Sequence, residues 1–294
     1  LFLFATKNDI SDILPLVALY AFAGYRLLPS LQDMFTAIAL IRSNLHSLEI
    51  IYNDLKGLKE STLPDRTDFS ALPFKNRIHM RKLGFKYDSS PDYIFKNFTV
   101  TIKANTTVGI VGPTGCGKTT LIDIILGLLT PSEGALVIDD VPIDDSNRHL
   151  WQNNCGNVPQ RIYLADDTIT RNIAFGLPDD EINMDAVIKA AKIANIHDLV
   201  TSEMQDGYNT VVGDRGIRLS GGQNQRIGIA RALYNDPAVL ILDEATSALD
   251  GYTEKAIMEA VSNLAQKKTI IMIAHRLATV KKCDVIHVLK KGRI

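Results

Sequence analysis

A glycine-rich segment constrains the possible folds of this chain more than any other feature of the sequence. Residues 107–120 read TVGIVGPTGCGKTT, and the apolar stretch Thr107 to Val111 leads through a loop into an apolar helical pattern from Lys118 to Leu129. A strand, a glycine loop and a helix in this order are the context of the phosphate-binding pattern G-x-x-x-x-G-K-[ST]. Its defined positions are filled by Gly112, Gly117, Lys118 and Thr119. The segment therefore predicts a loop that cradles phosphate groups, rather than a glycine turn that happens to precede a lysine.

Each part of this loop has its own task in holding phosphate. Glycines let the backbone curl so that consecutive N–H groups point at one anion, and the amino end of the following helix adds roughly half an elementary charge. Lys118 supplies a point charge to the terminal phosphates, and the hydroxyl of Thr119 offers a hard oxygen to Mg²⁺. The residues expected to line the ligand are Gly112, Pro113, Thr114, Gly115, Cys116, Gly117, Lys118, Thr119 and Thr120.

Composition narrows the class of protein. A length of 294 residues allows about two domains, and 46% apolar residues are enough for a substantial core. The net charge of −1 and the lack of a basic stripe argue against a nucleic-acid partner. The cysteines Cys116, Cys155 and Cys283 form no C-x-x-C pair, which argues against a zinc site or a disulfide framework and fits a reducing compartment. Cys116 is interpreted as a small filler between glycines rather than a redox group.

The N-terminal third carries two apolar segments. Ile13 to Tyr25 is uncharged and mostly apolar, but it is shorter than the roughly 20 residues that span a bilayer. It is either part of a longer membrane helix or an ordinary buried helix. From Leu31 to Leu55 apolar residues recur at steps of three and four, which predicts a long helix with one apolar stripe. Because the chain begins without Met at Leu1 and stops at Ile294 after a strand pattern, we expect a fragment cut at both ends.

A domain boundary follows this helical third. Gly57 to Pro73 has no period and contains scattered prolines and aspartates, as a linker does. The later apolar runs are continuous and separated by helical stretches, which is typical of a parallel sheet covered on both faces. An all-helical interval from about Asp167 to Asn235 predicts a separate lobe. The expected strands are Arg77 to Tyr87, Phe98 to Ile102, Val108 to Val111, Leu136 to Ile138, Val239 to Leu242, Ile270 to Ile273 and Val285 to Leu289.

Two carboxylates end one of these strands. The apolar run VLIL, residues 239–242, is followed by Asp243 and Glu244. In an open α/β sheet ligands gather at the carboxyl ends of the strands, so these side chains are expected near the phosphate loop. Asp243 suits Mg²⁺, held through water, and Glu244 suits orienting and deprotonating the water that attacks a terminal phosphate. An Asp-Glu pair is also common as a polar exit from a strand, and it is the phosphate loop that favours catalysis.

A second helix start also suits an anion. The sequence LSGGQ, residues 219–223, opens a helix, and Ser220 with Gln223 has capping-box spacing. Gly221 and Gly222 in the first turn cost roughly 1 kcal/mol each relative to alanine, which is sensible where something approaches the backbone closely. The alternative is a glycine-containing N-cap with no ligand. The simplest geometry that uses both anion sites is two chains packed head to tail, each covering the other's nucleotide.

Together these motifs resemble one family. From about Arg77 to the end, the chain is similar to the nucleotide-binding domain of ATP-binding cassette (ABC) transporters, because several motifs occur in the family's order. Residues 112–119 resemble its Walker A loop, residues 239–244 its Walker B strand with the catalytic glutamate, and residues 219–223 its signature. The resemblance implies a P-loop α/β fold with an antiparallel β subdomain and a helical subdomain, ATP and Mg²⁺ as ligands, and ATP hydrolysis.

Further catalytic roles are implied by this resemblance alone. Gln160, in the sequence VPQ, resembles the Q-loop glutamine that senses Mg²⁺ and the attacking water beside the membrane-domain contact. Ser247 to Asp250 resembles the D-loop, and His275 resembles the switch histidine that contacts the γ-phosphate. Read alone, Gln160 and Asp250 are ordinary turn residues, and His275 is a histidine at a strand exit.

The resemblance also implies the adenine, metal and partner contacts. Tyr87 resembles the aromatic residue that stacks on adenine, with Phe85 and Tyr93 as alternatives. The implied Mg²⁺ ligands are Thr119, Gln160 and Asp243. The residues implied to face the nucleotide of the partner subunit are Ser220, Gly221, Gly222, Gln223 and Asp250.

Two positions depart from the family pattern. Asn224 stands where a basic residue usually follows the signature glutamine, and Asp214 replaces a more usual glutamate in the preceding loop. Neither change removes a catalytic group. The aspartate at position 214 is expected to alter the contact with a membrane domain.

A long helix feeding an ATPase on one chain resembles an exporter-type half-transporter. On this resemblance residues 1–56 are the end of a transmembrane domain, residues 57–76 a linker, and residues 77–294 the ATPase domain, truncated at its C-terminus. Ile13 to Tyr25 is then the inner end of the last membrane helix, with the ATPase on the cytoplasmic side. The segment Ala21 to Leu55 looks most like bacterial flippases that move lipid-linked oligosaccharides.

The sequence thus predicts a motor subunit that binds MgATP, pairs with an identical or closely related subunit, and drives export or flipping of a hydrophobic or amphipathic substrate. One rival is a soluble cassette ATPase acting on DNA or ribosomes, which the single cassette and the apolar N-terminal run disfavour. Another is a regulatory module that binds ATP without turnover, which the intact set of catalytic residues disfavours. Transmembrane helices select the cargo, so these residues do not identify it.

The role expected of Glu244 gives a first test. Glu244→Gln keeps the shape of the side chain but removes the base, so we expect it to allow MgATP binding and pairing while phosphate release stops. A phosphate-release assay beside a nucleotide-binding assay measures both effects. Hydrolysis at the parent rate would remove Glu244 from this role.

Overall fold

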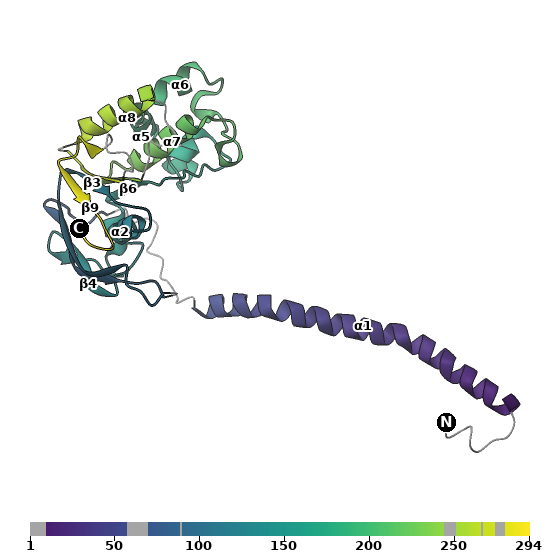
Figure 1. Ribbon diagram of the computed structural model, residues 1–294. Coiled ribbons are helices and arrows are strands. Elements are labelled where there is room, and N and C mark those ends of the chain that lie inside the picture. The colour runs from purple at the N-terminus through teal and green to yellow at the C-terminus, as the bar shows by residue number, and fades with distance from the viewer. Residues whose placement is uncertain (1–9, 58–69, 89, 244–250, 266, 274–279) are drawn as a thin grey trace. The chain divides into compact units, whose positions relative to one another are not determined.

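The computed structural model describes residues 10–57, 70–88, 90–243, 251–265, 267–273 and 280–294 of the chain. It divides into two compact units, Leu1–Asp65 and Arg66–Ile294. Figure 1 shows a single long helix in the first unit and a mixture of strands and helices in the second. The division falls within the segment 57–76 that the sequence suggests as a linker, and the nature of each domain stays a prediction.

The described part of the first unit is helix α1, Ile10–Gly57, which is 48 residues long. It continues through Pro15 and Pro29, so the two apolar segments of the sequence belong to one helix. Neighbouring residues of a helix point about 100° apart. In several pairs of adjacent apolar residues, each side chain is at least half exposed. These pairs are Leu27 with Leu28, Leu40 with Ile41, and Ile50 with Ile51. The predicted apolar stripe from Leu31 to Leu55 stays a prediction, with Leu40, Ile50 and Ile51 as apolar residues outside it.

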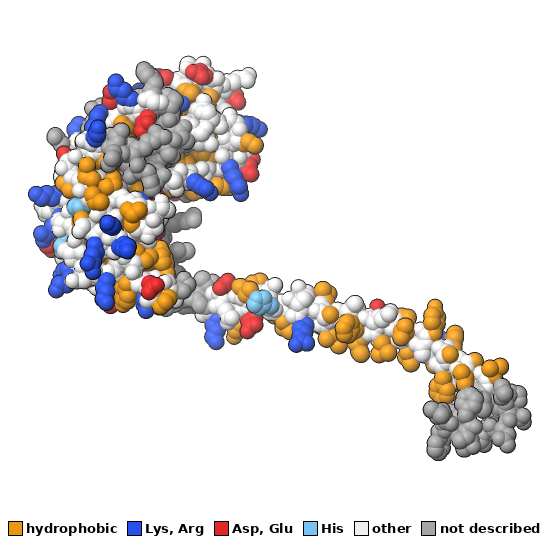
Figure 2. All heavy atoms as spheres, viewed as in Figure 1, with side chains coloured by type: hydrophobic (Ala, Val, Ile, Leu, Met, Phe, Trp, Pro, Cys, Tyr) orange, Lys and Arg blue, Asp and Glu red, His pale blue; other side chains and the backbone are white. Residues whose placement is uncertain are grey.

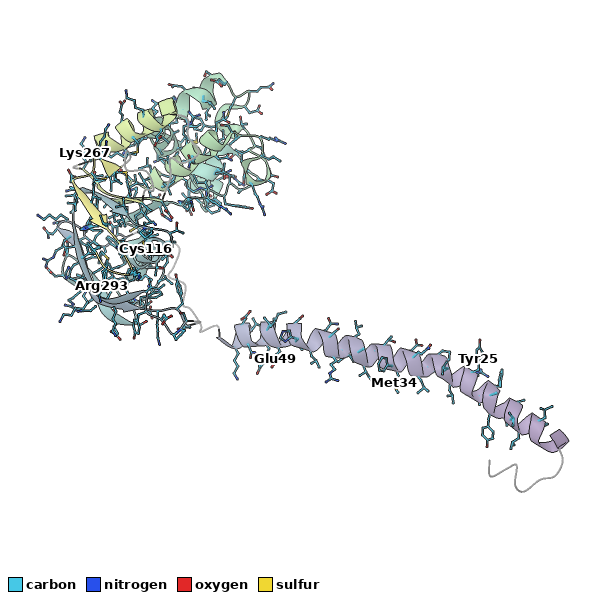
Figure 3. All side chains as sticks on the ribbon, in the orientation of Figure 1. Tyr25, Met34, Glu49, Cys116, Lys267 and Arg293 are labelled. Atoms are coloured by element: carbon cyan, nitrogen blue, oxygen red, sulfur yellow. The ribbon has the colours of Figure 1, made fainter. Side chains whose placement is uncertain are left out.

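Helix α1 has the length and composition of a membrane-spanning helix. Over Leu14–Lys56 it is long and apolar enough to cross a bilayer. Figure 2 shows hydrophobic side chains along most of the helix, with charged ones gathered toward its C-terminal end, and Tyr25 and Met34 project from it in Figure 3. The uncharged, mostly apolar run from Ile13 to Tyr25 suits burial either in protein or in a membrane. The first unit fits both environments.

A five-stranded parallel sheet organises the second unit. Its strands are β3 (Thr107–Val111), β6 (Cys155–Val158), β7 (Val239–Asp243), β8 (Thr269–Ile273) and β9 (Val285–Val288). They lie in the order β6-β7-β8-β3-β9, and each neighbouring pair is parallel. This is the parallel sheet that the sequence predicts.

Alternate residues of the central strands enter two different cores. Ile241 and Ile271 belong to a cluster that contains helix α2, Lys118–Ile125. Leu240 and Met272, their neighbours along the strands, belong to a second cluster formed with the helical lobe. Successive side chains of a strand point to opposite faces, so the sheet is covered on both faces, as predicted.

An antiparallel sheet covers the other side of α2. Its strands are β1 (Arg77–Phe85), β2 (Phe95–Lys103), β4 (Glu133–Ile138) and β5 (Val141–Pro142). Their order is β2-β1-β4-β5, with every pair antiparallel. Buried residues of both sheets share one core with Leu121, Ile124 and Ile125 of α2, and Figure 1 shows α2 between the two layers. The helix that begins at the phosphate loop is thus packed on two sides.

The helical lobe lies on the opposite face of the parallel sheet (Figure 1). Its helices are α4 (Ile169–Ile173), α5 (Met184–Ile193), α6 (His197–Ser202) and α7 (Gly221–Leu233), and α8 (Gly251–Leu264) follows β7. Arg231 of α7 donates from Nε to the carbonyl of Asn172 at 2.7 Å and from Nη1 to the carbonyl of Tyr163 at 2.8 Å. Burial lowers the pKa of this guanidinium below its ordinary value. These bonds hold α7 to α4 and to the segment after β6.

Some boundaries differ from those expected. The sequence does not predict β5, which is very short, or β6, whose sequence CGNV includes two residues that are rare in strands. Helix α2 ends at Ile125 rather than Leu129, because Gly127 adopts a φ of +69° that stops a helix. Leu128, which the predicted helical pattern includes, is therefore directed outward and is 60% exposed.

Trp151 anchors the far end of α2. It lies in α3 (Arg148–Gln152), is fully buried, and donates from Nε1 to the carbonyl of Ile125 at 2.7 Å. Its ring packs edge-on against Phe74, with 5.6 Å between the ring centroids. Phe74 belongs to the segment that leads into β1, so one side chain joins that segment to the helix of the phosphate loop.

We expect Trp151→Phe to lower the free energy of unfolding of the second unit by about 2–4 kcal/mol, because it removes a buried donor and leaves a cavity. Urea denaturation followed by circular dichroism measures the change. The matched control is Tyr163→Phe at a ring that is 58% exposed, where a change within about 0.5 kcal/mol is expected. Equal unfolding midpoints for the two variants would contradict the anchoring role.

Candidate functional site

The loop between β3 and α2 begins where two backbones come very close. A Cβ atom added at Gly112 would lie 2.3 Å from the carbonyl oxygen of Leu289 and 2.8 Å from Sγ of Cys116. Only glycine fits such a position without movement of the backbone. Cys116, labelled in Figure 3, is 6% exposed. Its sulfur fills space beside this glycine, in keeping with its interpretation as a filler.

Two further glycines give the loop its curvature. Gly115 has a φ of +77° and Gly117 a φ of +103°, in the region that glycine adopts without strain. Gly117 is the N-cap residue of α2 and has no side chain to cap the helix. The first N–H groups of α2 lack partners within the helix and can be satisfied by an anion. The amino end of α2 therefore meets the loop directly.

Lys118 lies within the curl of the loop. Its side chain is 8% exposed, and Nζ donates to the carbonyl oxygens of Gly112 at 2.8 Å and Pro113 at 3.1 Å. An ammonium group has three donors, and these carbonyls take two of them among the residues that the structure describes. A phosphate oxygen at the loop can accept the third. The lysine thus braces the loop and adds positive charge to it.

The carboxyl ends of neighbouring strands line up beside this loop. Ile110 of β3 and Asp243 of β7 both stand opposite Ile273 of β8, so they lie two strands apart, about 10 Å. Val158 ends β6, next to β7, and the exposed Gln160 follows shortly after it. The sheet register thus brings the predicted Walker B and Q-loop residues to the edge where the phosphate loop begins.

Helix α7 begins with the capping box that the sequence predicts. The backbone N–H of Gln223 donates to Oγ of Ser220 at 3.2 Å, and that of Ser220 donates to Oε1 of Gln223 at 2.8 Å. Ser220 and Gly221 are exposed. Asn224, one departure from the family pattern, lies against Gly216, where an added Cβ would come within 2.6 Å of Oδ1. A longer basic side chain would have to take another path here.

Of the three aromatic residues proposed to stack on adenine, two have exposed rings. Tyr87 is 40% exposed and Tyr93 is 39% exposed, whereas Phe85 is 5% exposed and has no ring face to offer. The hydroxyl of Tyr87 lies 3.2 Å from Oγ1 of Thr120 in α2. Tyr93 instead donates to Glu133 at 2.9 Å. Tyr87 is therefore the one attached to the helix of the phosphate loop.

Three predicted site residues, Glu244, Asp250 and His275, lie outside the described residues. Their roles stay predictions. Thr119, the expected metal ligand of the loop, is exposed in the first turn of α2.

The local sequence gives no sign of one contact that supports the phosphate loop. The turn after β9 approaches it from the other end of the chain, with Leu289 against Gly112. In the same turn, a Cβ at Gly292 would lie 2.0 Å from the carbonyl of Ile94. Contacts between residues so far apart leave no local pattern. A glycine near a strand end was the available signal, and it did not indicate a partner.

Comparison with known proteins identifies the family. The family model of the ABC transporter matches residues 95–247, just over half of the chain, and the chain belongs to this family. It is 42% identical over 233 residues to ABC transporter B family member 22 of Arabidopsis thaliana, covering 79% of this chain and 19% of that protein. It is 42% identical over 222 residues to multidrug resistance protein 4 of Entamoeba histolytica, covering 75% of this chain and 17% of that protein. The chain thus spans less than a fifth of these relatives.

A solved structure shares the fold. The structure of a bacterial Atm1-family ABC exporter with ATP bound matches 86% of this chain and 44% of that chain, with a TM-score of 0.74 and 36% identity. This confirms the ABC ATPase fold. The match is longer than residues 66–294, so it includes part of the first unit.

Gly112 gives a test of the loop. We expect Gly112→Ala to weaken ATP binding more than tenfold, because the new methyl group must displace the backbone at Leu289. Gly115→Ala is the matched control, since an added Cβ meets nothing within 4 Å there and the cost is that of a positive φ, about 1–2 kcal/mol. Equilibrium nucleotide binding and thermal unfolding of both variants measure this. Equal effects at the two glycines would contradict the close-approach argument.

Proposed function

We propose that this chain is the ATP-binding and ATP-hydrolysing part of an exporter-type ABC transporter. The observation that carries the proposal is the glycine loop, in which two left-handed glycines and a buried lysine converge on the uncapped start of α2. Such a loop binds a phosphate chain through backbone N–H groups and one fixed positive charge. Membership of the ABC family supports ATP as the nucleotide.

The proposed magnesium ligands are Thr119 at the start of α2, Asp243 at the end of β7 and Gln160 after β6. Thr119, Asp243 and Gln160 offer oxygen atoms of the kind that Mg²⁺ prefers. Bound there, the ion would neutralise charge on the phosphates. Lys118 holds the terminal phosphates, and the proposed base Glu244 takes a proton from the water whose oxygen attacks the γ-phosphorus, with ADP as the leaving group. His275 and Gln160 are proposed to position the γ-phosphate and that water.

The proposed partner is a second subunit of the same kind, packed head to tail. Ser220 and Gly221 are exposed at the start of a 13-residue helix, and glycines in its first turn allow close approach to its backbone N–H groups. In the proposed pair these groups face the γ-phosphate held by the other subunit, together with Asp250. Homodimer and heterodimer satisfy this geometry equally.

The proposed location is a membrane, with the ATPase on its cytoplasmic side. Helix α1 is long and apolar enough to cross a bilayer, and the likeness to a solved exporter extends into it. The proposed substrate class is hydrophobic or amphipathic. The narrower prediction, a lipid-linked oligosaccharide, depends on Ala21 to Leu55 alone.

The proposal is tested on the whole chain in detergent. We expect Lys118→Ala to weaken MgATP binding about 10–100-fold, since it removes a charged donor from phosphate, and to stop phosphate release. Lys192→Ala, at an exposed position of α5, is the matched control and should leave both unchanged. Carbonate extraction of membranes tests the location, and the chain is expected to stay with the lipid. Binding of MgATP that is insensitive to Lys118→Ala would contradict the proposed site.

A further inference from the structure

One face of α7 lies against both ends of the segment that carries Gln160. A Cβ atom added at Gly156 of β6, before Gln160, would lie 2.3 Å from the carbonyl oxygen of Ala232. A Cβ atom added at Gly228 would lie 2.3 Å from Cδ1 of Ile162, after Gln160. Gly228 and Ala232 are four positions apart, so they are neighbours on the surface of the helix. Helix α7 therefore contacts the chain on both sides of Gln160.

Arg231 of the same helix fixes this segment at a third point. Its Nη1 donates to the carbonyl oxygen of Tyr163 at 2.8 Å, and its Nε donates to that of Asn172 at 2.7 Å. Nη2 donates to Oδ1 of Asn172 at 2.9 Å, and the guanidinium lies over the ring of Phe175, 4.7 Å from its centroid. All three nitrogens of the planar group are engaged, an arrangement that the single nitrogen of a lysine does not reproduce.

Asn172 extends the same hold along the chain. This residue of α4 is fully buried. Its Oδ1 also accepts the backbone N–H of Ala165 at 2.9 Å, and its Nδ2 donates to the carbonyl oxygens of Ala165 and Thr168, both at 3.0 Å. A buried polar network whose members are satisfied specifies one arrangement of the chain. The residues that follow Gln160 are therefore connected to α7 directly through Arg231 and indirectly through Asn172.

We propose that Arg231 is a positioning residue for Gln160. The residues between Gly156 and Ile162 form a short loop with both ends fixed on α7, so the place of Gln160 at the carboxyl edge of the sheet depends on that helix. Without Arg231 the chain after Gln160 loses one of its attachments, and the amide is less often placed for the γ-phosphate and the attacking water. This inference rests on the proposed function of the site.

The first test compares the whole chain in detergent with Arg231→Met, which keeps a long side chain but removes its donors. We expect kcat for phosphate release to fall about tenfold while KM for ATP stays within about twofold, because the phosphate loop is unchanged. In a chain that already carries Gln160→Ala, Arg231→Met should lower kcat by less than about twofold, since the residue that it positions is gone. A purely structural role would lower kcat equally in both backgrounds.

Two further variants separate positioning from folding of the helical lobe. Gly228→Ala keeps every donor of Arg231, but its methyl group must displace Ile162, so it should also lower kcat without raising KM. The matched control is Tyr234→Phe. Oη of Tyr234, at the end of α7, accepts the backbone N–H of Asn183 at 2.9 Å. Its loss removes a bond of the same helix away from the Gln160 segment and should leave kcat and KM at parent values.

A measurement without nucleotide or metal completes the test. Trypsin cleaves after arginine, and Arg161 is exposed beside Gln160. We expect cleavage at Arg161 to be about three- to tenfold faster in Arg231→Met than in the parent chain, and unchanged in Tyr234→Phe.

An unchanged cleavage rate in Arg231→Met, an unchanged kcat, or an equal loss of kcat with and without Gln160→Ala would overturn the inference. If the unaltered chain releases no phosphate, the proposed function fails instead. Cleavage at Arg161 then still decides whether Arg231 fixes the segment, so the two failures are distinguished.

Discussion

The site depends on the close approach of the backbone at Gly112 to the carbonyl of Leu289. This contact places the start of the phosphate loop directly on the turn that follows β9, an edge strand that is parallel to β3. From there, left-handed glycines carry the chain around Lys118 and into α2. A methyl group at Gly112 would push the loop away from the carbonyl of Leu289. The positions of the following loop residues and of the start of α2 would then change as well.

Helix α2 connects the phosphate loop to the core of the second unit. Its first turn carries Lys118, Thr119 and Thr120, and its last carbonyl accepts the indole N–H of Trp151. Between these ends it is buried between the two sheets. The antiparallel sheet adds Tyr87 to the amino end, and the parallel sheet adds Asp243 through its register. Groups from distant parts of the sequence therefore meet because one short helix is fixed at both ends.

The sequence predicted the parts whose cause is local. The loop, the parallel strands and the capping box of α7 follow from glycine spacing, apolar runs and a serine three residues before a glutamine. The prediction from sequence failed where the cause lay far away in the chain, or where a glycine ended a helix within an apolar run. The predicted helical pattern continued to Leu129, but Gly127 ends the helix before Leu128, which is exposed. The support that Leu289 gives the phosphate loop left no trace in the local sequence.

In the proposed pair, two subunits share each nucleotide, with the glycine loop of one facing the α7 start of the other. Mixing a Lys118→Ala chain with a Ser220→Ala chain tests it most directly, because a head-to-tail pair of the two has one site with both parts intact. The measurement is the amount of labelled MgATP that stays bound through rapid gel filtration. The account predicts little retention for either variant alone and clear retention for the mixture. A mixture that retains only the average of its components would contradict it.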